Sequence, residues 1–376
     1  MTTDLDIKYG LAGVLADESA ISKVMEKTNA LTYRGYAVQE LCRHCSFEEV
    51  AYLLLGGELP STEELAAFKT KERGYREIGE TLVSLIRGCR VDAHPMDTLR
   101  TSVSFLGVQD GATGDTSLAA DHEKAIKLLA RIPTIVAADY RFRNGLELVA
   151  PRPDLGFAEN FFHMCFGEVP EPEVVKCFDI SLILYAEHSF NASTFASRVV
   201  TSTLSDIYSA VVSGICALKG SLHGGANEAV MHMMLEVGEP SLAHDWVHAA
   251  LASKRKIMGF GHRVYRNGDS RVPTMTAAFH AMAEHKGGKK WVEMAAAIER
   301  TMREEKDIHP NLDFPTGPAY YLMGFDIPMF TPVFVMSRVA GWAAHVMEQA
   351  KNNKLIRPLS AYVGPEQRSV APIGSR

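Results

Sequence analysis

Three residues in the second half of this chain could carry acid–base chemistry: His223, His262 and Asp313. Imidazole and carboxylate groups are the side chains that most often transfer protons at a reacting centre near neutral pH. The chain has fourteen histidines, so most of them must be bystanders. The residues around these three distinguish them from the rest.

His223 is followed by two glycines and then by an apolar helical run, Ala229–Val237. This pattern predicts a loop that enters a helix, with the histidine near the helix N-terminus. The positive end of a helix disfavours a protonated imidazole, and a neutral imidazole can donate a hydrogen bond to a carbonyl or enolate. Local sequence alone leaves two alternatives open: a helix-capping loop with an incidental histidine, and a phosphate-binding turn that lacks the lysine and spacing of a P-loop.

His262 lies among four basic residues, Lys256, Arg263, Arg266 and Arg271. A cationic neighbourhood suits an anionic substrate and keeps the pKa of the imidazole from rising. The alternative is a solvated basic loop. The apolar and glycine residues between the charges argue against it.

Asp313 stands between Leu312 and Phe314 in a proline-bounded segment. Apolar neighbours can desolvate a carboxylate and so make it a better base. Locally, an aspartate that caps a turn or a helix from Ala319 is the stronger interpretation.

Two arginines add to this pattern. Arg338 lies on an otherwise apolar helical segment, Val333–Met347, and Arg357 precedes a proline. A buried arginine is costly unless it is paired or faces a ligand, and arginine binds carboxylates with two parallel hydrogen bonds. A structural ion pair is the default interpretation for each.

The elements that must position these residues are predicted to be helices. Apolar residues recur at helical spacing in six segments: Ser46–Leu55, Ser61–Lys71, Thr116–Ala130, Pro172–Leu184, Lys289–Glu305 and Pro332–Lys351. Ser61 and Glu64 form the signature of a capping box, as do Ser46 and Glu49. Strand-like alternation is rare; Ile7–Val14 is one short candidate, and a hairpin near the N-terminus is compatible with the pattern. The fold class is therefore mostly α.

Composition excludes several classes of protein. Hydrophobic residues make up 47% and charged residues 22% of the 376 residues, and the net charge is -6, as in ordinary soluble domains. No long basic run suggests binding to nucleic acid or to an anionic membrane, no apolar stretch approaches the length of a membrane span, and the start does not have the pattern of a secretory signal. We therefore expect a cytoplasmic protein without nucleic-acid or membrane partners.

The six cysteines are scattered and do not form a disulfide framework. Cys42 and Cys45 form a C-x-x-C pair, but no second pair or nearby histidines complete a zinc site. Ordinary thiols near a helix end are the simpler interpretation. Glycines, by contrast, cluster around His223 and His262, which suggests that this part of the chain closes over a ligand.

Taken together and in order, these motifs resemble the citrate synthase family, including the 2-methylcitrate synthases. The resemblance covers nearly the whole chain and is strongest in segments 188–195, 222–228, 259–265 and 313–317. It implies a two-domain, mostly α-helical fold with a large domain (1–224 and 325–376) and a smaller mobile domain (225–324). It also implies a homodimer whose substrates are oxaloacetate and an acyl-CoA, with no cofactor and no metal.

The resemblance also implies a role for each residue. Asp313 matches the base that removes the proton next to the thioester, His223 the donor to the thioester carbonyl, and His262 the residue that polarises the ketone of oxaloacetate and protonates the new alkoxide. The residues that match oxaloacetate contacts are His188, Arg271, Arg338 and Arg357, the last from the partner subunit. The residues that match the coenzyme A contact region are Lys256, Ile257, Met258, Gly259, Phe260 and Arg266. Arg73 is a further substrate-contact candidate, as in methylcitrate-type relatives.

Chemistry supports these assignments. The α-proton of a thioester is a very weak acid, so its removal requires an immediate hydrogen bond to the developing enolate. The two carboxylates of oxaloacetate need several cations, and water must be excluded until the condensed thioester has formed, which a closing domain achieves.

The residue after His188 is Ser189, where many citrate synthases carry an acidic residue and methylcitrate-type members are more similar to this chain. We therefore expect propionyl-CoA to be accepted alongside acetyl-CoA. The chain has no room for the extra N-terminal domain of the larger NADH-regulated relatives, so we expect no inhibition by NADH. A citryl-CoA or acyl-CoA lyase working in the cleavage direction would use the same residues and stays an alternative. A non-enzymatic acyl-CoA-binding protein is disfavoured because Asp313, His223 and His262 are all present.

Overall fold

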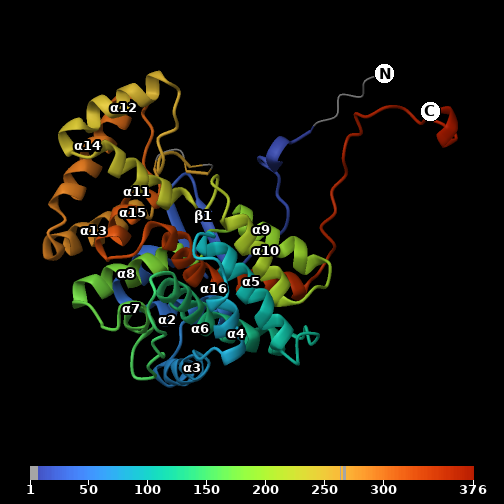
Figure 1. The fold of residues 1–376 in the computed structure, drawn as a ribbon, viewed down its shortest axis with the longest axis horizontal. Helices are drawn as coiled ribbons and strands as arrows, with labels where there is room; N and C mark the ends of the chain where they lie inside the picture. Colours follow the sequence, from blue (N-terminus) through green and yellow to red (C-terminus); the bar gives the residue numbers. More distant parts are fainter. Residues whose placement is uncertain (1–6, 263, 266–267) are drawn as a thin grey trace.

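The computed structural model describes residues 7–262, 264–265 and 268–376. Within them the chain is mostly α-helical (Figure 1), which confirms the predicted fold class. The α-helices are α1 Val38–His44, α2 Phe47–Gly56, α3 Thr62–Gly74, α4 Glu80–Arg87, α5 Pro95–Gln109, α6 Leu118–Arg143, α7 Phe157–Phe166, α8 Pro172–Tyr185, α9 Ala192–Ser202, α10 Ile207–Leu218, α11 Ala226–Val237, α12 Ala243–Ala252, α13 Val272–Lys286, α14 Lys289–Lys306, α15 Asp313–Leu322 and α16 Phe330–Lys351. Three short antiparallel strands, β1 Ser22–Met25, β2 Ala30–Tyr33 and β3 Tyr36–Ala37, form a small sheet in the order β1-β2-β3.

The six helices expected from apolar spacing are all present, as α2, α3, α6, α8, α14 and α16. Both capping boxes form, with Ser46 and Glu49 at the start of α2 and Ser61 and Glu64 at the start of α3. The strand expected at Ile7–Val14 was wrong. Residues Tyr9–Leu11 form a 3-10 turn in which the φ of Gly10 is 62°, and an extended segment there would have no neighbouring strand to satisfy its backbone. The hairpin near the N-terminus is confirmed by β1 and β2.

Helix α16 is the centre of the molecule. Every residue from Phe330 to Val346 is buried, and the helix packs against α2, α6, α8, α9 and α10. A helix that is apolar on all sides is expected to be buried on all sides. The few polar side chains on it, Arg338 and His345 among them, are therefore enclosed by the protein.

Helices α11 to α15 lie together at one side of the molecule (Figure 1). Helix α15 packs against both α11 and α13, and α13 also packs against α8. These helices span the segment 225–324 that the resemblance assigns to a small domain. Its mobility stays a prediction.

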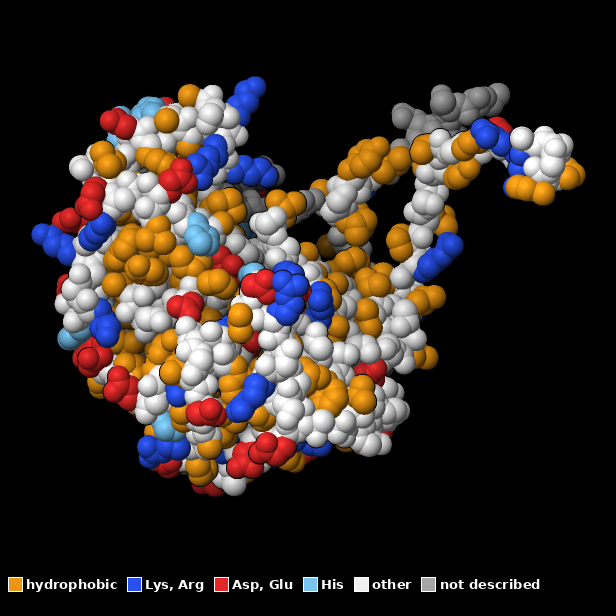
Figure 2. Space-filling model, viewed as in Figure 1, with side chains coloured by type: hydrophobic (Ala, Val, Ile, Leu, Met, Phe, Trp, Pro, Cys, Tyr) orange, Lys and Arg blue, Asp and Glu red, His pale blue; other side chains and the backbone are white. Residues whose placement is uncertain are grey.

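Both terminal segments run away from the helical body (Figure 1). Hydrophobic and charged side chains both appear on the body, and hydrophobic side chains recur along the described terminal segments (Figure 2). Leu15 is 97% exposed and Val363 is 94% exposed, and exposed apolar clusters of this kind mark interaction surfaces. In the described part of the chain, no helix has both the length and the apolar content required to span a bilayer.

Candidate active site

The structure brings six of the predicted residues together where several helix ends meet around α16. They are His188 in the link between α8 and α9, His223 in the turn before α11, His262 in the loop before α13, Arg271 at the N-terminus of α13, Asp313 at the start of α15 and Arg338 on α16. The rings of His188 and His262 lie 5.0 Å apart. Burial and then the positive charge of Arg271 hold the pKa of His188 well below its usual range, and Arg338 adds to this effect.

The surroundings of Asp313 raise the basicity of its carboxylate. Burial raises the pKa of its carboxyl to about 6, against the opposing effect of a hydrogen bond from Tyr185. The Tyr185 hydroxyl donates this bond to Oδ1 at 2.6 Å. A carboxylate with a pKa near 6 remains ionised at neutral pH and is a stronger base than an exposed aspartate.

His223 is held as a neutral hydrogen-bond donor. The backbone N–H of Ser193 points at Nε2 from 3.3 Å, and since an N–H can only donate, Nε2 accepts and the proton lies on Nδ1. The Ser193 hydroxyl accepts from Trp342 Nε1 at 3.1 Å, and its single proton is shared between two acceptors, His223 Nε2 at 2.9 Å and Asn191 Oδ1 at 2.7 Å. Burial, followed by the charge of Arg338, lowers the pKa of His223 to about 3. Nδ1–H is thus the free donor, as the neutral-imidazole interpretation required.

His262 is neutral with the opposite tautomer. Its Nδ1 accepts hydrogen bonds from the backbone N–H groups of Val264 and Tyr265, at 3.0 and 3.1 Å. The ring proton therefore lies on Nε2. Burial and then the charge of Arg271 lower the pKa of His262 to about 4. The cluster thus contains two neutral imidazole donors beside one carboxylate base.

Two buried polar groups in the cluster have no hydrogen-bond partner within the described residues: His188 Nε2 and Arg338 Nη1. Arg338 Nε donates to the Tyr185 carbonyl at 2.6 Å, and its guanidinium carbon lies 4.8 Å from the centre of the Phe334 ring. Buried polar groups are nearly always paired. These two unpaired groups therefore indicate a binding site for a polar ligand.

Arg271 is held in place by Asp269. The guanidinium donates to both oxygens of that carboxylate, at 2.9 and 2.6 Å, and Asp269 Oδ2 also accepts from the backbone N–H of Leu312. This two-point pairing fixes the orientation of the guanidinium. It also ties Arg271 to the residue next to Asp313.

The predicted coenzyme A segment packs against Phe314, the residue after Asp313. The rings of Phe260 and Phe314 are 4.6 Å apart. Gly259 has a φ of +81°, and a Cβ there would lie 2.6 Å from a methyl group of Val230 and 2.9 Å from Cβ of Phe314. Only glycine fits this turn, which is pressed against α11 and α15. Along the rest of the segment Lys256 is exposed, Ile257 is buried and Met258 is half-buried.

Two predicted contacts, Arg73 and Arg357, are not part of the cluster. Arg73 lies on α3, where Nη1 donates to the Pro153 carbonyl at 3.1 Å. Arg357 is exposed in the segment after α16. Arg266, like Arg263, lies outside the described residues. Among the residues that the structure describes, no group of three or more His, Cys, Asp or Glu side chains is arranged to hold a metal ion.

Tyr185 contacts Asp313 and Ser193 contacts His223, although sequence patterns assigned no role to either. The Tyr185 ring lies 4.0 Å from that of Phe334, which is in turn 6.4 Å from the ring of His223. A tyrosine at the end of an apolar helix, three residues before His188, is a usable signal, because a buried phenol needs a partner. Ser193 lies inside the motif 188–195, and only the fold shows what it bonds.

Comparisons with known proteins agree with this geometry. The family model described as citrate synthase, C-terminal domain, matches residues 10–359. A 2-methylcitrate synthase of Mycobacterium tuberculosis (strain ATCC 25618 / H37Rv) is 59% identical over 363 residues, which are 96% of this chain and 92% of that protein. A citrate synthase of Mycolicibacterium smegmatis is 57% identical over 364 residues, 97% of each chain.

A solved structure is also similar over its whole length. It is the ternary complex of carboxymethyl coenzyme A and oxaloacetate with citrate synthase from Thermoplasma acidophilum, with a TM-score of 0.91 and 32% identity. The match covers 99% of this chain and 100% of that chain. With a family model over most of its length and relatives above half identity, the chain belongs to the citrate synthase family.

Proposed function

We propose that this member of the citrate synthase family, which condenses an acyl-CoA with oxaloacetate, accepts propionyl-CoA as well as acetyl-CoA. Relatives of both kinds support the proposal, because a 2-methylcitrate synthase and a citrate synthase are 59% and 57% identical to the chain. The observation that carries the chemistry is the arrangement of three groups in complementary protonation states. Asp313 is a base with a raised pKa, and His223 and His262 are neutral donors of opposite tautomer.

In the first step Asp313 removes a proton from the carbon next to the thioester. The negative charge then develops on the thioester oxygen, and Nδ1–H of His223 is the donor that meets it. A donor placed for the developing charge contributes about 10²–10³ in rate, and a positioned base about 10²–10⁴. A neutral donor is preferable, because a protonated His223 would compete with the thioester as the acid for Asp313.

In the second step the enol carbon attacks the ketone of oxaloacetate. His262 donates from Nε2 to the ketone oxygen as it becomes an alkoxide. His188, Arg271 and Arg338 hold the two carboxylates, and the unpaired Nη1 of Arg338 supplies one of these contacts. The segment 225–324, with the coenzyme A contacts at 256–260 and Arg266, closes over the substrates and excludes water until the thioester of the product is ready for hydrolysis.

A panel of thioesters tests the acyl specificity. Release of free CoA that depends on oxaloacetate is measured with acetyl-CoA, propionyl-CoA and butyryl-CoA, and Asp313→Asn serves as the inactive control for spontaneous hydrolysis. We expect turnover with both of the shorter thioesters. Rejection of propionyl-CoA at saturating oxaloacetate would refute the proposed breadth, and CoA release without oxaloacetate would refute the condensation itself.

We also infer that the enzyme works as a homodimer in which Arg357 reaches the site of the partner subunit. Two observations support this. Arg357 is exposed and lies in a segment that runs away from its own helical body (Figure 1). The same segment and the N-terminal one expose large apolar side chains, such as Leu15, Leu359 and Val363, which need a surface to cover them.

Complementation tests the shared site. Asp313→Asn and Arg357→Gln are each inactive or weakly active alone, and the two variants are co-expressed with separable tags. In a mixed dimer, one site receives an intact Asp313 from one subunit and an intact Arg357 from the other. Random pairing then restores about a quarter of wild-type activity. If Arg357 serves its own subunit, mixed dimers regain nothing.

The enzyme is proposed to act in the cytoplasm. Oxaloacetate and acyl-CoA thioesters are intracellular metabolites, and the described part of the chain has no helix suited to cross a bilayer. Fractionation of cells that express the tagged chain, with activity and protein both recovered in the cytosolic fraction, is the expected result. Recovery with the membrane or in the medium would contradict it.

A further inference from the structure

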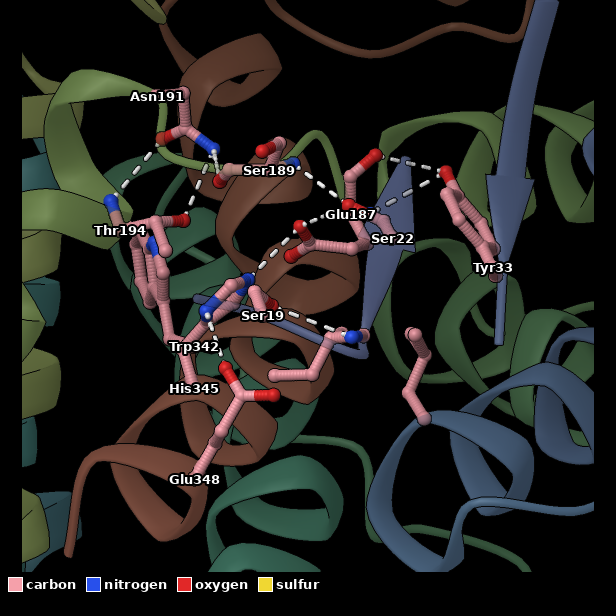
Figure 3. A network of polar contacts seen from close by, with 12 residues as sticks. Ser19, Ser22, Tyr33, Glu187, Ser189, Asn191, Thr194, Trp342, His345 and Glu348 are labelled. Carbon is pink, nitrogen blue, oxygen red and sulfur yellow. Dashed lines mark hydrogen bonds and ion pairs between the residues drawn. The ribbon is translucent and has the colours of Figure 1, made fainter. Parts of the chain in front are cut away.

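A buried carboxylate stands directly behind the proposed oxaloacetate contacts. Glu187 precedes His188 and is completely buried. Its Oε1 accepts hydrogen bonds from Ser22 Oγ at 2.9 Å and from His345 Nε2 at 3.0 Å. Figure 3 shows the side chain enclosed by Ser22 from β1 and His345 from α16, while Tyr33 holds its backbone. Its other oxygen, Oε2, has no hydrogen-bond partner within the described residues.

The hydrogen bonds around His345 show that Glu187 is the charged member of the pair. Arg198 Nη1 lies 3.1 Å from His345 Nδ1, and since a guanidinium only donates, Nδ1 accepts and the ring proton lies on Nε2. His345 is therefore neutral and donates to Glu187. The charge of Arg198 is already matched by Glu348 at 2.8 Å and Asp17 at 3.0 Å.

The free oxygen of Glu187 lies against α16, one turn from Arg338. Arg338, Gly341 and His345 are spaced by three and four residues, so they share one face of the helix. A Cβ on Gly341 would lie 2.5 Å from Glu187 Oε2 and 2.4 Å from the Ala186 carbonyl oxygen. Because Gly341 has no side chain, the Glu187 carboxylate can lie against α16 between the helical turn that carries Arg338 and the turn that carries His345.

The charges of Glu187 and Arg338, which have Oε2 and Nη1 respectively without a partner among the described residues, affect each other. Burial lowers the pKa of Arg338 to about 10, and Glu187 is the foremost charge that opposes this loss. Conversely, burial raises the pKa of Glu187, whereas the hydrogen bond from His345 and the positive charge of Arg338 lower it and favour the ionised carboxylate. No hydrogen bond joins the two side chains. The carboxylate offsets the charge of the guanidinium while leaving Arg338 Nη1 free for a ligand.

We propose that Glu187 is a resident counter-ion of Arg338 that weakens the binding of oxaloacetate and of the anionic product. In the empty site it offsets a buried positive charge that would otherwise be alone. When a substrate carboxylate binds Arg338, two anions share one cation, so the substrate is held less tightly than the arginine alone would hold it. This inference rests on the proposed role of Arg338 as an oxaloacetate contact.

The variant Glu187→Gln tests the inference, because glutamine keeps an oxygen acceptor for Ser22 and His345 and removes only the charge. The dissociation constant of oxaloacetate is measured by calorimetry, and the melting temperature is measured with and without oxaloacetate. We expect a lower melting temperature in the empty enzyme, a roughly tenfold tighter dissociation constant and a larger stabilisation by oxaloacetate than in the wild type. A folded variant whose affinity is unchanged or weaker overturns the proposal.

Two further variants separate the causes. Glu72→Gln, on α3, removes another buried carboxylate, which is paired with the buried Arg76 just after that helix. We expect this variant to lower the melting temperature without tightening the binding of oxaloacetate. Arg338→Gln tests the foundation. If it leaves oxaloacetate affinity unchanged, the proposed function of Arg338 fails. If it weakens affinity while Glu187→Gln does not tighten it, only the counter-ion role fails.

A double variant keeps the proposal testable if Glu187→Gln alone does not fold. Removing one member of a buried ion pair leaves an uncompensated charge, whereas removing both is often neutral. Glu187→Gln combined with Arg338→Gln is therefore expected to melt at a higher temperature than Glu187→Gln alone. A double variant that is no more stable than Glu187→Gln contradicts the counter-ion role.

Discussion

Arg76 and Arg338 are each only 1% exposed, yet their surroundings differ. Arg76 donates from Nε and Nη2 to Glu72 at 2.8–3.1 Å and from Nη1 to the carbonyls of Arg152 and Leu155, both at 2.9 Å. Arg338 makes one hydrogen bond, to the Tyr185 carbonyl, and its Nη1 has no partner among the described residues. A fully paired buried charge holds the fold together, whereas a partly paired one marks a place for a ligand.

Two buried carboxylates show the same contrast. Burial raises the pKa of Asp179 to about 7, with a further contribution from Glu48, and it raises that of Asp313 to about 6. Asp179, on α8, accepts a hydrogen bond from the backbone N–H of Phe47 at the start of α2. Asp313 belongs to the cluster that contains two neutral donors, His223 and His262, and the partly paired Arg338. A raised pKa alone does not identify a base; its neighbours do.

The largest effect is expected from Asp313→Asn. The amide cannot accept a proton from the thioester substrate, so kcat falls by about 10³–10⁴. The melting temperature does not fall, because a buried charge is removed and the bond from Tyr185 can still be accepted. Asp179→Asn is the matched control and retains kcat. Turnover by Asp313→Asn within tenfold of the wild type contradicts the assignment of the base.

Arg76→Met is expected to lower stability without lowering kcat, the opposite of Asp313→Asn. It leaves Glu72 buried and unpaired, which costs about 3–5 kcal/mol of unfolding free energy, while kcat and KM per folded molecule stay unchanged. Urea unfolding and steady-state kinetics on the folded fraction measure the two effects. Combining the change with Glu72→Gln restores part of the stability. A loss of oxaloacetate affinity instead would place Arg76, with the adjacent Arg73, in the substrate site.

Local sequence patterns predicted the helices well, because apolar spacing and capping residues act within one or two turns. They did not predict what Asp313 bonds, since its partner Tyr185 is 128 residues away. For the same reason His223 was left undecided by its own surroundings. The depressed pKa of His223 is caused first by burial and then by Arg338, and neither can be read from the loop itself. Only the ordered set of motifs, through a family resemblance, connected these residues before the fold did.

Asp179, the carboxylate compared above with Asp313, is expected to make the stability of the protein depend on pH. Its pKa in the folded state, about 7, lies above the ordinary value of 3.8, so the folded protein binds a proton more tightly than the unfolded chain does. Stability therefore falls as pH rises from about 4 to 7 and stays low above 7. Asp179→Asn removes this loss, so it stabilises the protein at pH 8 by at most ~4 kcal/mol and has little effect at pH 4.

Melting temperatures of the wild type and Asp179→Asn at pH 5 and pH 8 measure this effect. The advantage of the variant must grow with pH. An advantage that is constant or that shrinks would show that Asp179 is ionised in the fold at both pH values. In that case Asp179 and Asp313 would differ in their pKa values as well as in their hydrogen-bond partners and charged neighbours.

The smallest effect is expected from Ser193→Ala. The backbone N–H of residue 193 still donates to His223 Nε2, so the tautomer survives, while the hydroxyl that connects the ring to Asn191 and Trp342 is lost. We expect kcat to fall by about tenfold, the size of one outer hydrogen bond, with KM for oxaloacetate unchanged. Ser197→Ala, one turn further along α9, removes a hydroxyl that donates to the Ser193 carbonyl, and we expect it to leave kcat unaltered. Equal losses in both variants would mean that the start of α9 supports the site by packing and that the orientation of His223 does not depend on the hydroxyl.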